Sequence, residues 1–383
     1  MQRYLSLQTQ PFIAEKPSDD LFLSVVIPAH NEPDLLRCID SLAACHMTKH
    51  DVEVIVVVNE SEGTPPEVLK QNARSLHQLE EWKQNHQQAP FKLHSIHPAP
   101  FRHKFRGVGS ARKAGMDEVI HRYHSINQPQ GIIISLDADT LVEPNYLTAI
   151  ETHFLQNPHS IGCTIDFKHR IDELDNVHQK EGMQRYEQYL HDFKNSLQLT
   201  GYPHAIHTIG SAFACRANAY AKQGGMPRRQ AGEDFYFLHK LTNMGKLSEL
   251  HETCVYPSAR VSDRVPFGTG PSIQRWLDGD NSIGMNYNRQ AFLDLRDFFA
   301  SMPELHHAQT TTKYTEILNL FLDVDNFWTQ MLPQLQRNSG SFQSFEKHFF
   351  QYFNTFKIIQ FLNFCHPNPY SYQESPSAPK GVS

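Results

Sequence analysis

Two pairs of neighbouring acids are the side chains of this sequence best suited to chemistry. Asp137 and Asp139 stand two positions apart in Ser-Leu-Asp-Ala-Asp-Thr, directly behind the apolar run 131–136. At the end of a strand, side chains at this spacing point to the same side. Like charges so close repel unless a cation lies between them, and a hard divalent ion such as Mn2+ or Mg2+ takes oxygen ligands together with substrate phosphates. The alternative is a pair of solvated turn aspartates, which the apolar run behind them disfavours.

The second pair, Glu233 and Asp234, follows Gly232 at the start of a helix predicted for 233–244. The helix dipole alone favours acids in a first turn. One carboxylate could instead be a general base that takes the proton of an attacking hydroxyl. Both interpretations stay open on local grounds.

Three further segments carry groups suited to a nucleotide or its phosphates. Asn31 follows a strand, where it could bind a ligand, cap the next helix or do both. Gly107 and Gly109, near a helix start, would let the backbone approach a phosphate. Neither a dinucleotide fingerprint nor a Walker A loop is present there. Arg260 and Arg264 lie in a glycine-bearing loop that could close over a diphosphate or form surface ion pairs.

These segments lie between strands and helices that alternate along the chain. Short β-branched runs predict buried strands at 21–28, 52–58, 91–96 and 131–136, and the small apolar run 210–216 predicts a further strand. Helices are predicted at 66–86, 108–123, 176–197 and 233–244. The alternation predicts an α/β fold with a mostly parallel sheet flanked by helices. Ligands of such sheets bind beyond the carboxyl ends of the strands, where the polar turns lie.

The composition changes after residue 270. Residues 271–366 favour a helical region in which phenylalanines recur at helical spacing, at Phe342, Phe345, Phe349, Phe353 and Phe356. Core packing, or a homodimer seam through these helices, is favoured over a membrane-facing stripe because the opposite face is not strongly basic. The Pro- and Ser-rich residues 367–383 are typical of a disordered tail.

Overall composition excludes several functional classes. The 35 Lys and Arg against 41 Asp and Glu give a net charge of -6, which offers no electrostatic footprint for nucleic acid. The six cysteines form no C-x-x-C pair, which suits reduced thiols rather than a zinc site. No secretory signal and no apolar span of ~20 residues occurs. We therefore expect no transmembrane segment and a cytoplasmic location, with peripheral attachment to the inner face of a membrane left open.

Five motifs occur in a fixed order between residues 21 and 245: V-V-I-P-A-H-N-E, V-I-V-V-V-N-E-S, G-V-G-S-A-R-K-A-G, S-L-D-A-D-T and G-E-D-F. That order resembles the family 2 glycosyltransferases, which have the GT-A (Rossmann-like) fold. The resemblance implies metal-dependent, inverting transfer of a sugar from a UDP- or GDP-type donor to a hydroxyl acceptor, which could be a glycan, a lipid-linked molecule or a small molecule. The processive members' Q-x-x-R-W motif and membrane helices are lacking, so we expect a non-processive enzyme.

We expect four parts along the chain. An N-terminal extension covers 1–20, and the GT-A domain covers 21–270. That domain divides into a nucleotide-binding half, 21–140, and an acceptor half, 141–270. The helical region over 271–366 and the tail over 367–383 follow.

The resemblance also implies roles for single residues. The nucleotide-sugar donor would be bound by Pro28, Ala29, Asn31, Glu32, Asn59, Glu60, Arg112, Asp137 and Ala138. Asp139 would hold the metal, with Asp263 or His251 as candidates for a further ligand. Asp234, with Glu233 beside it, would be the catalytic base, while Arg260 and Arg264 would help the diphosphate depart. The usual second-strand aspartates are replaced here by Asn59 and Glu60, which leaves the nucleobase open.

Two other functions remain as alternatives. A nucleotidyltransferase acting on a sugar phosphate also uses paired aspartates on a metal, although the Gly-Glu-Asp helix start favours transfer from a sugar donor. A non-catalytic scaffold that binds sugar nucleotides is the other, against which the presence of every acidic position argues.

Overall fold

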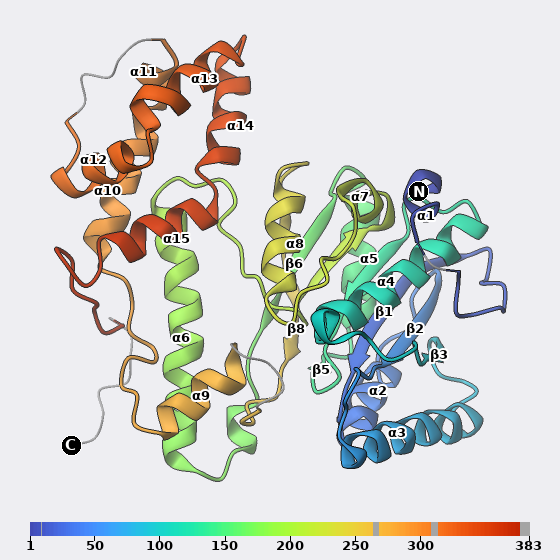
Figure 1. Ribbon diagram of the computed structural model, residues 1–383. Helices are drawn as coiled ribbons and strands as arrows, with labels where there is room; N and C mark the ends of the chain where they lie inside the picture. The colour runs from blue at the N-terminus through green and yellow to red at the C-terminus, as the bar shows by residue number, and fades with distance from the viewer. Residues whose placement is uncertain (9, 263–267, 308–312, 376–383) are drawn as a thin grey trace. The chain divides into compact units, whose positions relative to one another are not determined.

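The computed structural model describes residues 1–8, 10–262, 268–307 and 313–375 (Figure 1). The chain forms two compact units. The first contains Met1–Lys180 and Thr208–Gln274, and the second contains Glu181–His207 and the chain from Arg275 onward. The second unit therefore takes in 181–207, which we expected within the acceptor half of the first domain.

An eight-stranded sheet forms the centre of the first unit. Its strands are β1 (Leu21–Ala29), β2 (Asp51–Val58), β3 (Lys92–Ile96), β4 (Ile132–Ser135), β5 (Leu141–Val142), β6 (Gly162–Phe167), β7 (Phe213–Arg216) and β8 (Ser248–Tyr256). The strand order is β3-β2-β1-β4-β7-β6-β8-β5. The strands β3, β2, β1 and β4 are parallel, and β6 is parallel to β8. Three pairings, β4 with β7, β6 with β7, and β5 with β8, are antiparallel.

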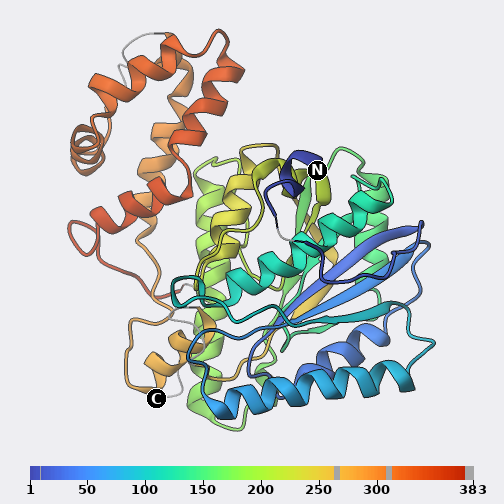
Figure 2. The same ribbon diagram turned by 45° about the vertical axis from the view of Figure 1, so that its right-hand side comes forward.

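The parallel strands are buried because helices cover both faces of the sheet. Every residue of β1 and β4 is buried, as expected of β-branched strands in a parallel sheet. Figure 2 shows α2 (Leu35–Ala43) and α3 (Pro66–Asn85) on one face and α4 (Val108–Ser125) on the other. Strands are added in one direction from β1 to β3, and β4 lies on the other side of β1, so right-handed crossovers place these helices on opposite faces.

A glycine allows α4 to lie close to the sheet. A methyl group at Gly115 would lie 2.5 Å from Cγ1 of Val26 on β1 and 2.7 Å from Cγ2 of Val57 on β2. The remaining helices of this unit are α1 (Gln2–Leu5), α5 (Tyr146–Gln156), α7 (Ala217–Gln223) and α8 (Glu233–Thr242). α6 (Val177–Leu199) and α9 (Thr269–Leu277) each begin in this unit and end in the second.

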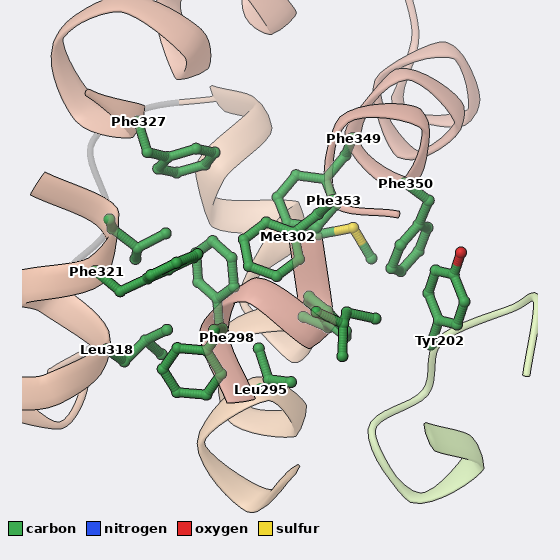
Figure 3. Close-up of a cluster of buried hydrophobic side chains, with 14 of the residues drawn as sticks. Tyr202, Leu295, Phe298, Met302, Leu318, Phe321, Phe327, Phe349, Phe350 and Phe353 are labelled. Atoms are coloured by element: carbon green, nitrogen blue, oxygen red, sulfur yellow. The ribbon is translucent and has the colours of Figure 1, made fainter. Parts of the chain in front are cut away.

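The second unit has its own core of aromatic side chains (Figure 3). Its other helices are α10 (Arg289–Ala300), α11 (Met302–His307), α12 (Glu316–Val324), α13 (Leu332–Arg337), α14 (Phe342–Tyr352) and α15 (Thr355–Phe364). Three members of the predicted phenylalanine stripe, Phe345, Phe349 and Phe353, are fully buried in this core. Phe342 is 37% exposed. The stripe therefore serves core packing, and the helical C-terminal region is confirmed.

The α/β fold is confirmed. The strands that differ from the sequence predictions lie in the part of the sheet beyond β7. The strands β5, β6 and β8 were not predicted: β5 has two residues, and β8 carries the polar run Ser-Glu-Leu-His-Glu-Thr. The tail also differs from the expected disorder as far as residue 375, because the backbones of Asn286 and Gln373 exchange two hydrogen bonds.

The N-terminal extension packs onto the first unit. The hydroxyl of Tyr4 donates a 2.6 Å hydrogen bond to Asp117 of α4, and the backbone N–H of Phe12 donates to Glu118. Across the described parts of the chain, no helix combines the length and the apolar character needed to cross a membrane.

Candidate active site

The Asp-x-Asp turn directly follows β4, in the middle of the sheet. The N–H of Leu136 still donates to Val26 of β1, and Thr140 closes the turn by donating its N–H to the carbonyl of Asp137 at 3.0 Å. Ala138 between the acids is buried, whereas the side chains of Asp137 and Asp139 are 36% and 22% exposed. The turn therefore fixes the backbone and leaves both carboxylates accessible.

Arg112 joins this turn to the start of α8. Its side chain is only 2% exposed, and its Nη2 donates to Oδ1 of Asp137 at 2.9 Å while its Nε donates to Oε1 of Glu233 at 3.0 Å. Nη1 donates to the carbonyl of Gly210 at 3.1 Å and to the hydroxyl of Ser135. One guanidinium therefore brings together acids that are far apart in the sequence.

Asp234 lies beside Glu233 in the first turn of α8. Gly232 before them has φ 69°, a left-handed conformation that suits glycine. Oδ1 of Asp234 accepts a hydrogen bond from the N–H of Phe235 at 2.7 Å. Burial raises the pKa of Asp234 to about 7, the negative charge of Glu233 adds to this rise, and the positive charge of Arg112 opposes it. A carboxyl group with this pKa can accept a proton near neutral pH.

Arg260 occupies the other side of the Asp-x-Asp turn. Its Nη2 lies 3.4 Å from Oδ2 of Asp139, and its Nη1 lies 3.3 Å from Oδ2 of Asp34. The same guanidinium pairs with the fully buried carboxylate of Glu32. Three carboxylates therefore converge on a single cation.

The turns after β1 and β2 are tied to each other. The N–H of Asn59 donates to Ala29 at 3.0 Å, and the carbonyl of Asn59 accepts from Nδ2 of Asn72 at 3.1 Å. Oδ1 of Asn72 accepts from the N–H of Asn31, which has a φ of 50°. Asparagine tolerates that left-handed conformation better than most residues. Pro28, at the end of the buried strand β1, precedes this turn.

Residues 24–224 match the model of glycosyl transferase family 2. The chain belongs to this family. It is a glycosyltransferase. The Asp-x-Asp turn, α4 and the parallel half-sheet, apart from the first three residues of β1, lie within the matched residues.

Several solved glycosyltransferase structures are similar to the chain at low identity. TarS of S. aureus has 15% identity and a TM-score of 0.43 over 82% of this chain and 50% of TarS. The complex of TarS 1–349 with UDP-GlcNAc has 13% identity and a TM-score of 0.45 over 95% of this chain and all of that one. The Pyrobaculum calidifontis mannosyltransferase PcManGT, in complex with GDP-Man and Mn2+, has 13% identity and a TM-score of 0.39 over 92% of this chain and 93% of that one. No curated protein matches by sequence.

The structure of this glycosyltransferase brings the predicted arginines Arg112 and Arg260, with the acids that they contact, into two connected groups. Arg112 links Asp137 to Glu233, and Arg260 links Asp139 to Glu32. Glu60 contacts neither group: its carboxylate is 3.3 Å from Nε2 of His97. His251 contacts Asp166 on β6 at 2.9 Å rather than the Asp-x-Asp turn. Asp263 and Arg264 lie outside the described residues.

Other residues of the site had no signal in the sequence. Asp34 and Asn72 each contact a predicted residue, but only through the fold. Arg170 was not among the predicted site residues either. Its Nη2 donates a 2.9 Å hydrogen bond to the backbone carbonyl of Asp139 and so stabilises the turn.

Proposed function

We propose that this glycosyltransferase transfers a sugar with inversion from a nucleotide-diphosphate donor, UDP- or GDP-linked, to a hydroxyl acceptor. Asp234 is the general base, and a divalent cation, Mn2+ or Mg2+, is held at Asp139. The observation that carries this proposal is the buried guanidinium of Arg112, which contacts Asp137 and Glu233 at 2.9 and 3.0 Å. This link supports a single site in which the donor turn and the base helix act on one sugar.

The position of Asp234 suits a base in a single in-line displacement. Inversion requires the acceptor oxygen to lose its proton as it attacks the anomeric carbon from the side opposite the leaving diphosphate. Burial and the neighbouring charge of Glu233 raise the pKa of Asp234 to about 7. Asp234 is therefore ionised above neutral pH, yet basic enough to accept that proton.

The donor set at Asp139 suits a hard cation. No group of three or more His, Cys, Asp or Glu side chains that could hold a metal occurs among the described residues. Hard divalent cations such as Mg2+ are nevertheless commonly held by one or two carboxylates, and substrate phosphates and water complete the coordination shell. The acids Glu32, Asp34 and Asp139 gather around Arg260 and place three carboxylates at this part of the site. When bound, the cation neutralises charge on the leaving diphosphate.

Arg260 and the turns after β1 and β2 are assigned to the donor. A guanidinium at the Asp-x-Asp turn can contact phosphate oxygens with two N–H groups. The hydrogen-bonded turns at Asn31 and Asn59 offer fixed polar groups for the ribose and base. Arg112 fixes the position of the Asp137 carboxylate through a 2.9 Å hydrogen bond.

Donor binding and base catalysis are tested separately. A thermal-shift screen of UDP-, GDP- and dTDP-sugars with and without Mn2+ should find a donor that raises the melting temperature, because a ligand of the folded state stabilises it. Transfer by the Asp234→Asn variant should fall by ~10²–10⁴-fold while donor binding is retained. The matched control is Asp51→Asn, an exposed aspartate at the opposite end of the sheet.

Equal transfer by Asp234→Asn and the wild type would refute the base assignment. Retention of the donor's anomeric configuration in the product, read by NMR, would refute inversion. Release of pyrophosphate from a nucleoside triphosphate would instead identify a nucleotidyltransferase.

A further inference from the structure

Five basic side chains beside the site are not used by the chemistry above. They are Arg102, Lys104 and Arg106 in the segment before α4, and Arg228 and Arg229 in the segment before α8, and we call them the basic rim. All five are exposed. Among the described residues, none has an ion-pair partner: the one polar side-chain contact is between Arg106 and the ring of His103 at 2.9 Å. Other cations of the same unit, such as Arg37, Lys92 and Arg122, pair with carboxylates.

The two segments of the basic rim touch each other. A methyl group at Gly107 would lie 2.7 Å from the Cα of Gln230, and one at Gly109 would lie 2.5 Å from the carbonyl oxygen of Arg229. Only glycine permits so close an approach of the two backbones. The rim is thus formed by the loops that lead into α4 and α8, which lie next to each other (Figure 1).

These loops end directly at the catalytic groups. Arg112 comes three positions after Gly109, and Glu233 comes three positions after Gln230. Nε of Arg112 donates a 3.0 Å hydrogen bond to Oε1 of Glu233. Asp234, the proposed base, follows immediately. The basic rim therefore lies beside Asp234, to which the acceptor hydroxyl has to come if Asp234 is the base.

Charges of the rim are held close together by aromatic rings. Nζ of Lys104 lies 4.6 Å from the ring centroid of Phe105, and the guanidinium of Arg228, from the other segment, lies 5.3 Å from the same centroid. Arg229 lies over the ring of Tyr236, two positions beyond Asp234. Like charges gathered this way repel each other, and an anion between them would remove that repulsion.

We infer that the acceptor of this enzyme is anionic and carries phosphate or carboxylate groups beside the hydroxyl that is attacked. The inference rests on the proposed function. Guanidinium groups bind both kinds of anion with paired N–H donors. A membrane surface fits less well, because none of the exposed large apolar side chains of the unit belongs to the rim segments, and the ring of Phe105 is covered by cations.

The test compares charge reversals at two places. Lys104→Glu/Arg228→Glu removes two cations of the rim. Lys70→Glu/Arg74→Glu makes the same change in net charge on the exposed surface of α3 and is the matched control. Binding of fluorescent dextran sulfate and of neutral dextran is measured by anisotropy. Transfer is measured with acceptor pairs that differ by one anion, methyl glucuronide against methyl glucoside and glycerol 3-phosphate against glycerol.

We expect the wild type to bind dextran sulfate but not dextran, and the rim variant to bind it about tenfold more weakly, which corresponds to about 1.4 kcal/mol. The control should bind as the wild type does. Transfer should favour the anionic member of each pair, and the rim variant should lose that preference. Stabilisation by nucleotide sugars should be unchanged in both variants.

Four results would overturn the inference. Two are equal binding of charged and neutral dextran, and equally weakened dextran sulfate binding in the rim variant and the control. The others are loss of nucleotide-sugar stabilisation in the rim variant, and rim-dependent binding of single-stranded RNA or phosphatidylglycerol vesicles that exceeds the binding of dextran sulfate. If no nucleotide sugar stabilises any of the three proteins, the proposed function fails instead. That outcome is read from the melting temperature, independently of the dextran measurement.

Discussion

Gly210 lies against the carboxylate of Asp234. A methyl group on Gly210 would be 3.1 Å from Oδ2 of Asp234 and 2.8 Å from Nη2 of Arg112, which is bonded to Asp137. In the Gly210→Ala variant one of these buried groups must move. We expect kcat to fall at least about tenfold, with a loss of stability of about 1–3 kcal/mol. Single-turnover kinetics and urea unfolding would measure the two effects.

Gly245→Ala is the control for this substitution, because its methyl group would meet Ile161 at an ordinary 3.4 Å. A Gly210→Ala enzyme with wild-type kcat would show that the contact between Gly210 and Asp234 does not constrain the base.

Glu233 should set the pH at which the enzyme becomes active. After burial, its charge is the largest cause of the raised pKa of Asp234. The base works only when ionised, so kcat/KM should fall as the pH drops through about 7. In Glu233→Gln the repulsion is gone, ionisation of Asp234 is easier, and the acid limb should move to lower pH. Glu67→Gln, also a first-turn acid, should not move it.

An unchanged acid limb in Glu233→Gln would mean that another group controls the profile. The measurement is kcat/KM against pH, because this ratio reports the ionisation of the free enzyme.

Arg260 should affect metal and donor binding in opposite directions. Its guanidinium neutralises Glu32, Asp34 and Asp139. In Arg260→Met these acids lose the positive charge of this guanidinium, so Mn2+ alone should bind several-fold more tightly. The complex of Mn2+ with UDP or GDP should bind more weakly, because a phosphate partner is lost. Calorimetry of both titrations would measure the effects.

The control for Arg260 is Arg296→Met, which breaks an exposed pair with Asp297 in the second unit and should change neither affinity. Weaker binding of Mn2+ alone by Arg260→Met would show that the acids around this arginine do not attract the cation.

The stability of the second unit should depend on Phe349. Its ring is fully buried, and its centroid lies 5.5 Å from that of Phe298. Phe349→Ala would leave a cavity and lower the free energy of unfolding by about 3–5 kcal/mol. Phe342→Ala, on the same helix but 37% exposed, should cost much less. Equal urea midpoints for the two variants would contradict the assignment of this stripe to the core.

The parallel half of the sheet was predictable because each of its elements carries its own signal. The runs at β1, β2 and β4 are apolar and β-branched over their buried length. By contrast, β8 pairs along its length with β6. Its buried residues follow no regular pattern, so no apolar run in the sequence predicts this strand. Its pairing depends on segments more than 80 residues away in the sequence.

The candidate site divides in the same way. Asp137, Asp139 and Asp234 were found because neighbouring acids after a strand or at a helix start form a local pattern. The contacts of Gly210, Asn72 and Arg170 depend on which loops the folded sheet brings together. A single sequence does not contain that information as a local pattern.

Strand direction changes at β4, which is parallel to β1 on one side and antiparallel to β7 on the other. The turns after β1, β2 and β4, which are assigned to the nucleotide, therefore belong to one sub-sheet. The strands β6, β7 and β8 form another, and Arg260 follows β8. A lineage could remodel those loops of the second set of strands that carry neither Arg260 nor Asp234 to accept new partners without rebuilding the first. The same boundary is where chimaeras between relatives should be joined.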